Sequence, residues 1–187
     1  MDSSPESWQI IAPGLIEHPW NEAEVLGATV WLNLHSDHHR FRPMHSLSNL
    51  LIPAIKHRQF LLISSQGQAI FYLSWAQFSA EAELRYVNSP PLALQESDWH
   101  SGPRRWIVDW IAPFGHTVAI SRLIKQHYFR NSCFRSLYHR GDEKGLRIQS
   151  FYGRGLNARQ AKQWFNSHPV LLASGQPQSL SMVWDQT

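Results

Sequence analysis

The sequence contains one cysteine, Cys133, among its 187 residues, so no disulfide can form within the chain. A lone cysteine in a chain of this size favours a reducing compartment, and we expect a cytoplasmic protein. No apolar run reaches the length of about 18 residues that suggests a membrane span, and the segment MDSSPESWQ has no basic region. We therefore expect neither a transmembrane helix nor a secretory signal.

Excess charge and glycine-rich loops are also scarce. Lysine and arginine number 17 against 14 for aspartate and glutamate, and a net charge of +3 is too small to indicate nucleic-acid binding. Neither the P-loop pattern GxxxxGKS/T nor the dinucleotide pattern GxGxxG occurs, which disfavours nucleotide hydrolysis. We expect no nucleic-acid partner.

Apolar and aromatic residues, by contrast, are plentiful. The chain is 43% hydrophobic and has nine tryptophans and nine phenylalanines, enough for the core of one domain. Proline-rich residues 1–22 indicate an extension that either lies over the domain or is partly mobile. Residues 23–168 form the expected domain, and 169–187 a loose tail.

Hydrophobic periodicity predicts an α+β fold. The predicted helices cover 23–35, 46–59, 116–130 and 157–168, and the predicted strands cover 60–65, 69–79, 82–87, 104–115, 134–140 and 146–154. Gly67 marks a tight hairpin turn, and the strand at 104–115, apolar on both faces, is predicted to be central. This order favours a mostly antiparallel central sheet flanked by helices, as in a single GNAT-like acyltransferase domain.

Asp109 is the only charge within the run WIVDWIAPF. Strand alternation places it on one face with Ile107 and Ile111, where an ionised carboxylate is costly unless it is paired. It is therefore either a structural carboxylate that caps backbone N–H groups or holds an arginine, or a functional one.

A second concentration of polar residues follows the first predicted helix. His35, Ser36, His38 and His39 lie in an HSDHHR segment, and an imidazole is able to accept a proton near neutral pH. The alternatives are a solvated loop and a metal cluster, although HxxHH lacks the HExxH spacing. Ser36 is a nucleophile or a helix cap, and no GxSxG elbow supports the nucleophile. Cys133 is either activated by its basic surroundings or buried and inert.

Basic residues recur on the third predicted helix, 116–130, and beyond it. They are Arg122, Lys125, Arg130, Arg135, Arg140 and Lys144. Such a set either docks an acidic protein or a phosphate, or forms an ordinary solvated face.

The chain resembles the RTX toxin-activating lysine acyltransferases, the cytoplasmic activators of haemolysin-type protoxins. The likeness runs from Val25 to His168 and is carried by VLGATVWL, SDHHRFRP, LLIPAIKHRQFLLI, the SWA of residues 74–76 with ELRYVN after it, and above all SGPRRWIVDWIAPFG. It implies a GNAT-like enzyme that transfers a fatty acyl chain from acyl carrier protein to internal lysine ε-amines of an RTX protoxin.

The resemblance also implies roles for particular residues. The histidine of the S-x-x-H-R motif falls on His39, its serine on Ser36, and the essential aspartate on Asp109. Pro103 stands where the family usually has an acidic residue. Neither a bound cofactor nor a metal is expected, and the family expectation is a homodimer.

Acyl carrier protein is acidic, so Arg122, Lys125 and Arg130 are the candidate docking residues. Two alternatives remain beside this interpretation. One is a GNAT-like enzyme that acylates a small amine from acyl-coenzyme A, and the other is a non-catalytic basic binding module or chaperone for an acidic protein.

Overall fold

The computed structural model describes residues 8–89, 94–137 and 147–171. Its helices, including π and 3-10 segments, are α1 (Glu22–His35), η1 (Leu47–Leu51), α2 (Ile52–Lys56), α3 (Ala80–Asn88), η3 (Glu96–Asp98), α4 (Thr117–Leu123), η4 (Ile124–Tyr128) and α5 (Ala158–Ser167). Its strands are β1 (Trp8–Ile11), β2 (Phe60–Ser65), β3 (Gln68–Phe78), β4 (Arg104–Ile111), β5 (Cys133–Leu137) and β6 (Ile148–Tyr152).

The strands follow the order β1-β2-β3-β4-β5-β6, which confirms the α+β class and the interior place of β4. β1 pairs with β2, β2 with β3, and β5 with β6 in antiparallel fashion, whereas β4 and β5 are parallel. A parallel pair needs a crossover connection, and α4 with η4 forms it in the sequence between β4 and β5. The sheet is therefore mostly antiparallel, as predicted.

The chain divides into two compact units, and β3 and β4 each run from one into the other. The first comprises the residues up to 75 together with 109–118, and the second comprises 76–108 together with the residues from 119 onward.

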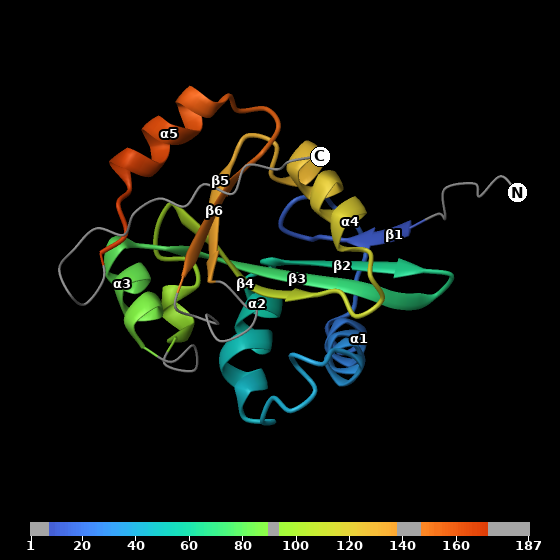
Figure 1. Ribbon diagram of the computed structural model, residues 1–187. Coiled ribbons are helices and arrows are strands. Elements are labelled where there is room, and N and C mark those ends of the chain that lie inside the picture. The colour runs from blue at the N-terminus through green and yellow to red at the C-terminus, as the bar shows by residue number, and fades with distance from the viewer. Residues whose placement is uncertain (1–7, 90–93, 138–146, 172–187) are drawn as a thin grey trace, which may run out of the picture. The chain divides into compact units, whose positions relative to one another are not determined.

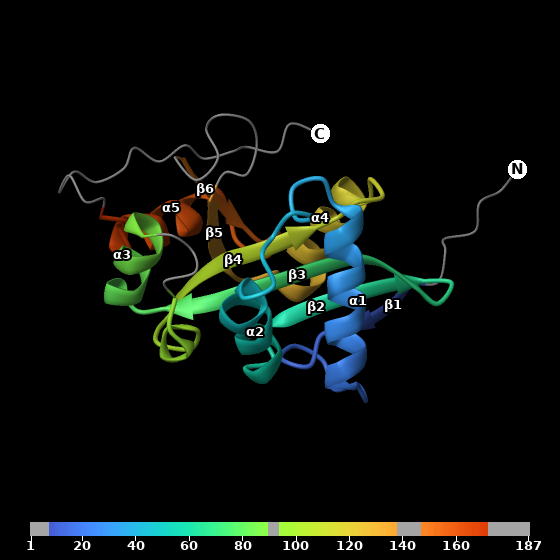
Figure 2. The same ribbon diagram turned by 90° about the horizontal axis from the view of Figure 1, so that it is seen from below.

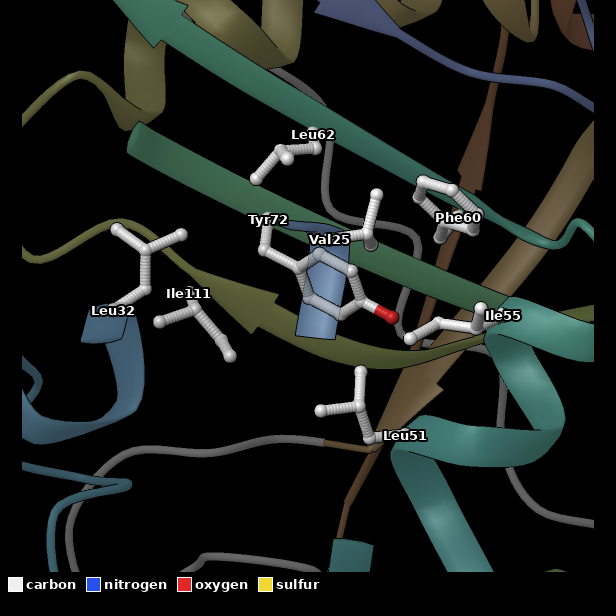
Figure 3. Packing of buried hydrophobic residues seen from close by; sticks show 8 residues of the cluster. All are labelled: Val25, Leu32, Leu51, Ile55, Phe60, Leu62, Tyr72 and Ile111. Carbon is white, nitrogen blue, oxygen red and sulfur yellow. The ribbon is translucent and has the colours of Figure 1, made fainter. Parts of the chain in front are cut away.

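In the first unit, α1 and α2 lie on one face of the β2–β3 hairpin (Figures 1 and 2). Figure 3 shows the core between these layers, in which apolar side chains from both helices and from the strands point toward one another. Its buried members are Val25, Leu32, Leu51, Ile55, Phe60, Leu62, Tyr72 and Ile111. This packing fixes the C-terminal end of α1 relative to the end of β4.

The β2–β3 turn confirms the predicted hairpin. Gln66 and Gly67 both have positive φ angles, of 50° and 78°, between the paired residues Ser65 and Gln68. Positive φ at both central residues gives the right-handed twist that two-residue hairpin loops require, and glycine adopts it without a steric penalty.

The second unit corrects the strand predicted at 82–87, because this segment is the helix α3. Ser79 caps the helix by accepting a hydrogen bond from the Ala82 N–H at 3.2 Å. Glu81 and Glu83 lie in the first turn, where negative side chains interact favourably with the helix dipole. The Ala-Glu-Ala-Glu-Leu-Arg composition has high helix propensity, so these local signals outweigh the β-prone Tyr86 and Val87.

Glu83 faces inward from α3 and holds a buried ionic cluster. Its carboxylate accepts hydrogen bonds from Arg104, from the Trp106 indole at 2.7 Å and from Arg135 at 3.1 Å. Arg135 is only 1% exposed, and burial lowers the pKa of its guanidinium while Glu83 opposes that change. Because the paired charges satisfy one another, this cluster is tolerated in the interior.

Two further predictions are affected near the ends of the chain. Residues 8–11, within the segment predicted only as an extension, form the strand β1 at the edge of the sheet. Arg140 and Lys144, and the tail beyond residue 171, lie outside the described residues. Within the described ranges, no helix has the length and hydrophobicity that a bilayer crossing requires.

Candidate functional site

The loop that follows α1 places the predicted histidine. Asn21 caps the start of α1, and the helix ends at His35, where the extended Ser36 returns its N–H to the Asn33 carbonyl. The N–H groups of His39 and Arg40 then bond the Ser36 carbonyl at 2.9 and 2.8 Å, which bends the chain back on itself. The turn brings the side chain at position 39 over the serine at position 36.

Ser36 and His39 are in direct contact. The Ser36 Oγ lies 2.7 Å from His39 Nδ1, a hydrogen-bonding distance, and the serine is buried. The His39 side chain is 14% exposed, so the imidazole is held by the loop yet accessible to a reactant. With Nδ1 occupied by the hydroxyl, Nε2 is the nitrogen that faces outward from this contact.

Asp109 lies against Nε2 of the same imidazole. Its Oδ1 is 3.9 Å from His39 Nε2, and its side chain is only 3% exposed. The carboxylate is also held by Arg42, whose Nη2 donates to Oδ1 at 2.7 Å and whose Nη1 donates to Oδ2 at 3.0 Å. Asp109 thus holds an arginine, as one sequence-based alternative required, and it also faces the predicted base.

Asp109 lies near the buried core of the first unit. Ile111, two residues along the same strand, belongs to the buried core with Tyr72 of β3. Burial raises the pKa of the Tyr72 phenol well above its ordinary value, and the negative charge of Asp109 raises it further, whereas the Ser74 hydroxyl and Arg42 act in the opposite direction. The phenol therefore stays protonated beside the carboxylate.

The other histidines of the HSDHHR segment are not brought to this contact. The His35 ring lies 4.0 Å from the Trp31 ring between centroids, in a tilted arrangement, and its Nδ1 lies 2.8 Å from the Trp31 carbonyl. His38 is exposed. Among the residues that the structure describes, no three histidine, cysteine, aspartate or glutamate side chains form a group that could hold a metal ion.

The basic set separates into exposed and buried members. Arg122 and Arg130 are exposed, and the Lys125 ammonium lies 5.7 Å from the centre of the Phe151 ring. Arg135 is buried against Glu83, so the prediction that it belongs to an exposed basic set was wrong. A buried arginine requires a charged partner that the fold brings to it. The spacing of basic residues along the chain therefore could not distinguish the buried arginine from the exposed ones.

Cys133 is the buried and inert thiol of the two alternatives. Burial raises the pKa of the Cys133 thiol to about 11, although the neighbouring Arg135 charge lowers it in part. A thiol in this state contributes little thiolate at neutral pH and is a poor nucleophile.

Arg42 is the site residue that sequence reasoning missed. The signal was present, because a lone carboxylate within a buried strand needs a cationic partner. The sequence did not indicate which arginine that partner is, and the fold shows that Arg42 reaches Asp109.

Comparison with known proteins identifies the family to which this chain belongs. The HlyC family model of RTX toxin acyltransferases matches residues 18–152. The protein-lysine myristoyltransferase RtxC of Kingella kingae is 35% identical over 143 residues, covering 76% of this chain and 84% of the relative.

Two more relatives agree with this match. The RTX-I toxin-activating lysine-acyltransferase ApxIC of Actinobacillus pleuropneumoniae is 34% identical over 82% of this chain and 88% of its own length. The protein-lysine palmitoyltransferase CyaC of Bordetella bronchiseptica is 32% identical over 88% of both chains. The predicted resemblance and the acyltransferase class are thereby confirmed, and the chain belongs to the HlyC family of RTX toxin acyltransferases.

Proposed function

We propose that this protein activates an RTX protoxin in the cytoplasm by transferring a fatty acyl chain from acyl carrier protein to internal lysine ε-amines. Relatives are named as toxin-activating lysine acyltransferases, a myristoyltransferase and a palmitoyltransferase. The observation that carries the proposal is the contact of His39 with Ser36 on one ring nitrogen and Asp109 beside the other.

The reaction needs a base because a lysine side chain has a pKa of about 10.4 and is protonated at neutral pH. His39 Nε2 takes a proton from the ammonium, and the neutral amine attacks the thioester carbonyl. The C–N bond forms, the C–S bond breaks, the carrier thiolate leaves, and the second proton of the attacking nitrogen passes to that thiolate. The product is an amide, and no bound cofactor takes part in the balance.

Asp109 contributes through charge. At 3.9 Å the carboxylate and Nε2 are too far apart for a hydrogen bond with each other, so one N–H donor is able to contact both atoms. We assign this position to the ε-nitrogen of the substrate lysine. Asp109 then attracts the ammonium and stabilises the imidazolium that forms when the proton moves.

Ser36 acts as a positioning residue in this scheme. Its hydroxyl oxygen accepts a hydrogen bond from Nδ1–H, the tautomer in which Nε2 is the unprotonated nitrogen, and the same bond persists once the ring is protonated. It thereby holds the imidazole plane with Nε2 toward Asp109. Transfer proceeds directly within a complex of donor, enzyme and protoxin.

Docking of the donor is assigned to Arg122, Lys125 and Arg130, because acyl carrier protein is acidic. Arg122 and Arg130 are exposed, as a docking residue must be. The homodimer implied by the resemblance stays a prediction, which sedimentation of the protein at several concentrations would check.

The test mixes the protein with myristoyl- or palmitoyl-acyl carrier protein and the candidate RTX protoxin, and measures peptide masses for an acylated lysine. His39→Ala and Asp109→Asn should lose transfer while the proteins remain folded. His38→Ala removes the adjacent, exposed imidazole and serves as the matched control.

Acylated lysine that disappears in the two site variants but not in His38→Ala supports the proposal. A protoxin that binds tightly but remains unmodified would favour a binding module, and an acylated small amine from acyl-coenzyme A would favour the other enzyme class.

A further inference from the structure

Arg42 has a defined place beside the proposed reaction. We propose that Arg42 is a positioning residue, which clamps the buried carboxylate of Asp109 and turns it toward His39. The inference rests on the proposed function, since it assigns Arg42 to the same lysine acylation.

The geometry of the pair carries the first step. The two terminal nitrogens of the Arg42 guanidinium donate one hydrogen bond each to Asp109: Nη2 to Oδ1 at 2.7 Å and Nη1 to Oδ2 at 3.0 Å. Two parallel bonds of this kind fix the plane of a carboxylate as well as its distance, which a lysine ammonium cannot do. The oxygen that accepts the shorter bond, Oδ1, is the one that faces His39 Nε2. Arg42 therefore sets the orientation of the oxygen that the reaction uses.

Burial carries the second step. Asp109 is 3% exposed and Arg42 is 23% exposed, so the pair lies mostly away from water. An ionised carboxylate at such a depth is costly without a paired charge, and a nearby cation favours its charged form. Around Asp109, the loop after α1 contributes Arg42 and His39, and β3 contributes the Tyr72 phenol, whose pKa is raised by burial. Arg42 is thus the permanent positive charge of this set.

The loop itself carries the third step. The Arg42 N–H donates to the His39 carbonyl at 2.9 Å, so one short turn holds both the base and the residue that clamps Asp109. A shift of this turn moves both side chains together. The distance between His39 and Asp109 is therefore maintained by a local hydrogen bond as well as by the core.

The test compares Arg42→Gln and Arg42→Lys with the wild type. For each protein, kcat and the KM for protoxin are measured with acyl-carrier donor across a range of pH. Arg42→Gln should lower kcat by about 10- to 100-fold with little change in KM, since misplacing a catalytic group is costly.

Arg42→Lys keeps the charge but not the paired bonds. Its kcat should fall less than that of Arg42→Gln, because the charge stays but the paired bonds that orient the carboxylate are lost. Guanidinium ion added to Arg42→Ala should restore part of the lost rate. Arg159→Gln, at an exposed position of α5, is the matched control for an arginine-to-glutamine change.

A folded Arg42→Gln protein with the wild-type kcat would overturn the inference, and so would an increased rate, which would make Arg42 a competitor of the substrate lysine. If Arg42→Gln does not fold, the kcat of Arg42→Lys and the guanidinium rescue decide. A wild-type protein that acylates no protoxin would instead contradict the proposed function.

Discussion

Ser36→Ala separates the two routes by which the acyl group could reach the lysine. In the proposed direct transfer, the serine only orients His39 through the 2.7 Å contact with Nδ1. A neutral hydrogen bond contributes about 0.5–1.5 kcal/mol. If that whole amount is lost in the transition state, the rate falls by about 2- to 12-fold.

A serine that carries the acyl group would behave differently. Removing a nucleophile from a catalytic unit costs about 1000-fold or more, because the covalent route is then closed. The expected loss for the positioning role is therefore at least about 80-fold smaller, so an ordinary rate assay distinguishes the two.

The assay measures the initial rate of lysine acylation with acyl-acyl carrier protein and protoxin, and the intact mass of the enzyme after incubation with donor alone. Ser48→Ala, at an exposed serine of the following helical segment, is the control. Loss of nearly all activity in a folded Ser36→Ala protein, or an acyl group found on wild-type Ser36, would refute the direct route.

The remaining predictions concern the second unit. Glu83→Gln should lower the free energy of unfolding by about 3–5 kcal/mol, because the Arg135 charge stays buried; denaturant titration checks this, with the exposed Glu81→Gln as control. Cys133, with a pKa of about 11, should be about 0.1% thiolate at pH 8 and resist iodoacetamide until the protein unfolds, and rapid native labelling would contradict its burial. Arg122→Glu should raise the KM for acyl carrier protein several-fold at low salt with kcat unchanged. The difference in KM between variant and wild type should shrink as the salt concentration increases. If the KM changes neither with the substitution nor with salt, Arg122 is not part of the docking face.

Local signals in the sequence were sufficient for several features. The Gln66–Gly67 turn is predictable because a two-residue hairpin loop needs positive φ angles, and whether a residue adopts them depends on that residue itself. The interior place of β4 follows from apolar residues on both of its faces. The sequence also indicated that Asp109 needs a partner, since burying a lone carboxylate is unfavourable wherever the strand lies.

Local signals also misled where two of them competed. Tyr86 and Val87 suggested a strand, but the Ser79 cap and the acidic first turn of α3 favoured a helix. The strand β1 was missed because its four residues are stabilised by pairing with β2, more than fifty residues away. A short edge strand carries too little periodicity of its own to be recognised.

The sequence indicates that a buried charge such as Asp109 needs a charged partner. Which residue serves as the partner follows from the packing of segments that are distant in the chain. Asp109 meets Arg42 and His39, which lie 67 and 70 positions earlier in the chain. Arg135, one of a row of similar basic residues, meets Glu83 and is buried, whereas Arg122 remains exposed. Burial and ion pairing depend on segments distant in the chain, and these are brought together only when helices and strands pack around a common core.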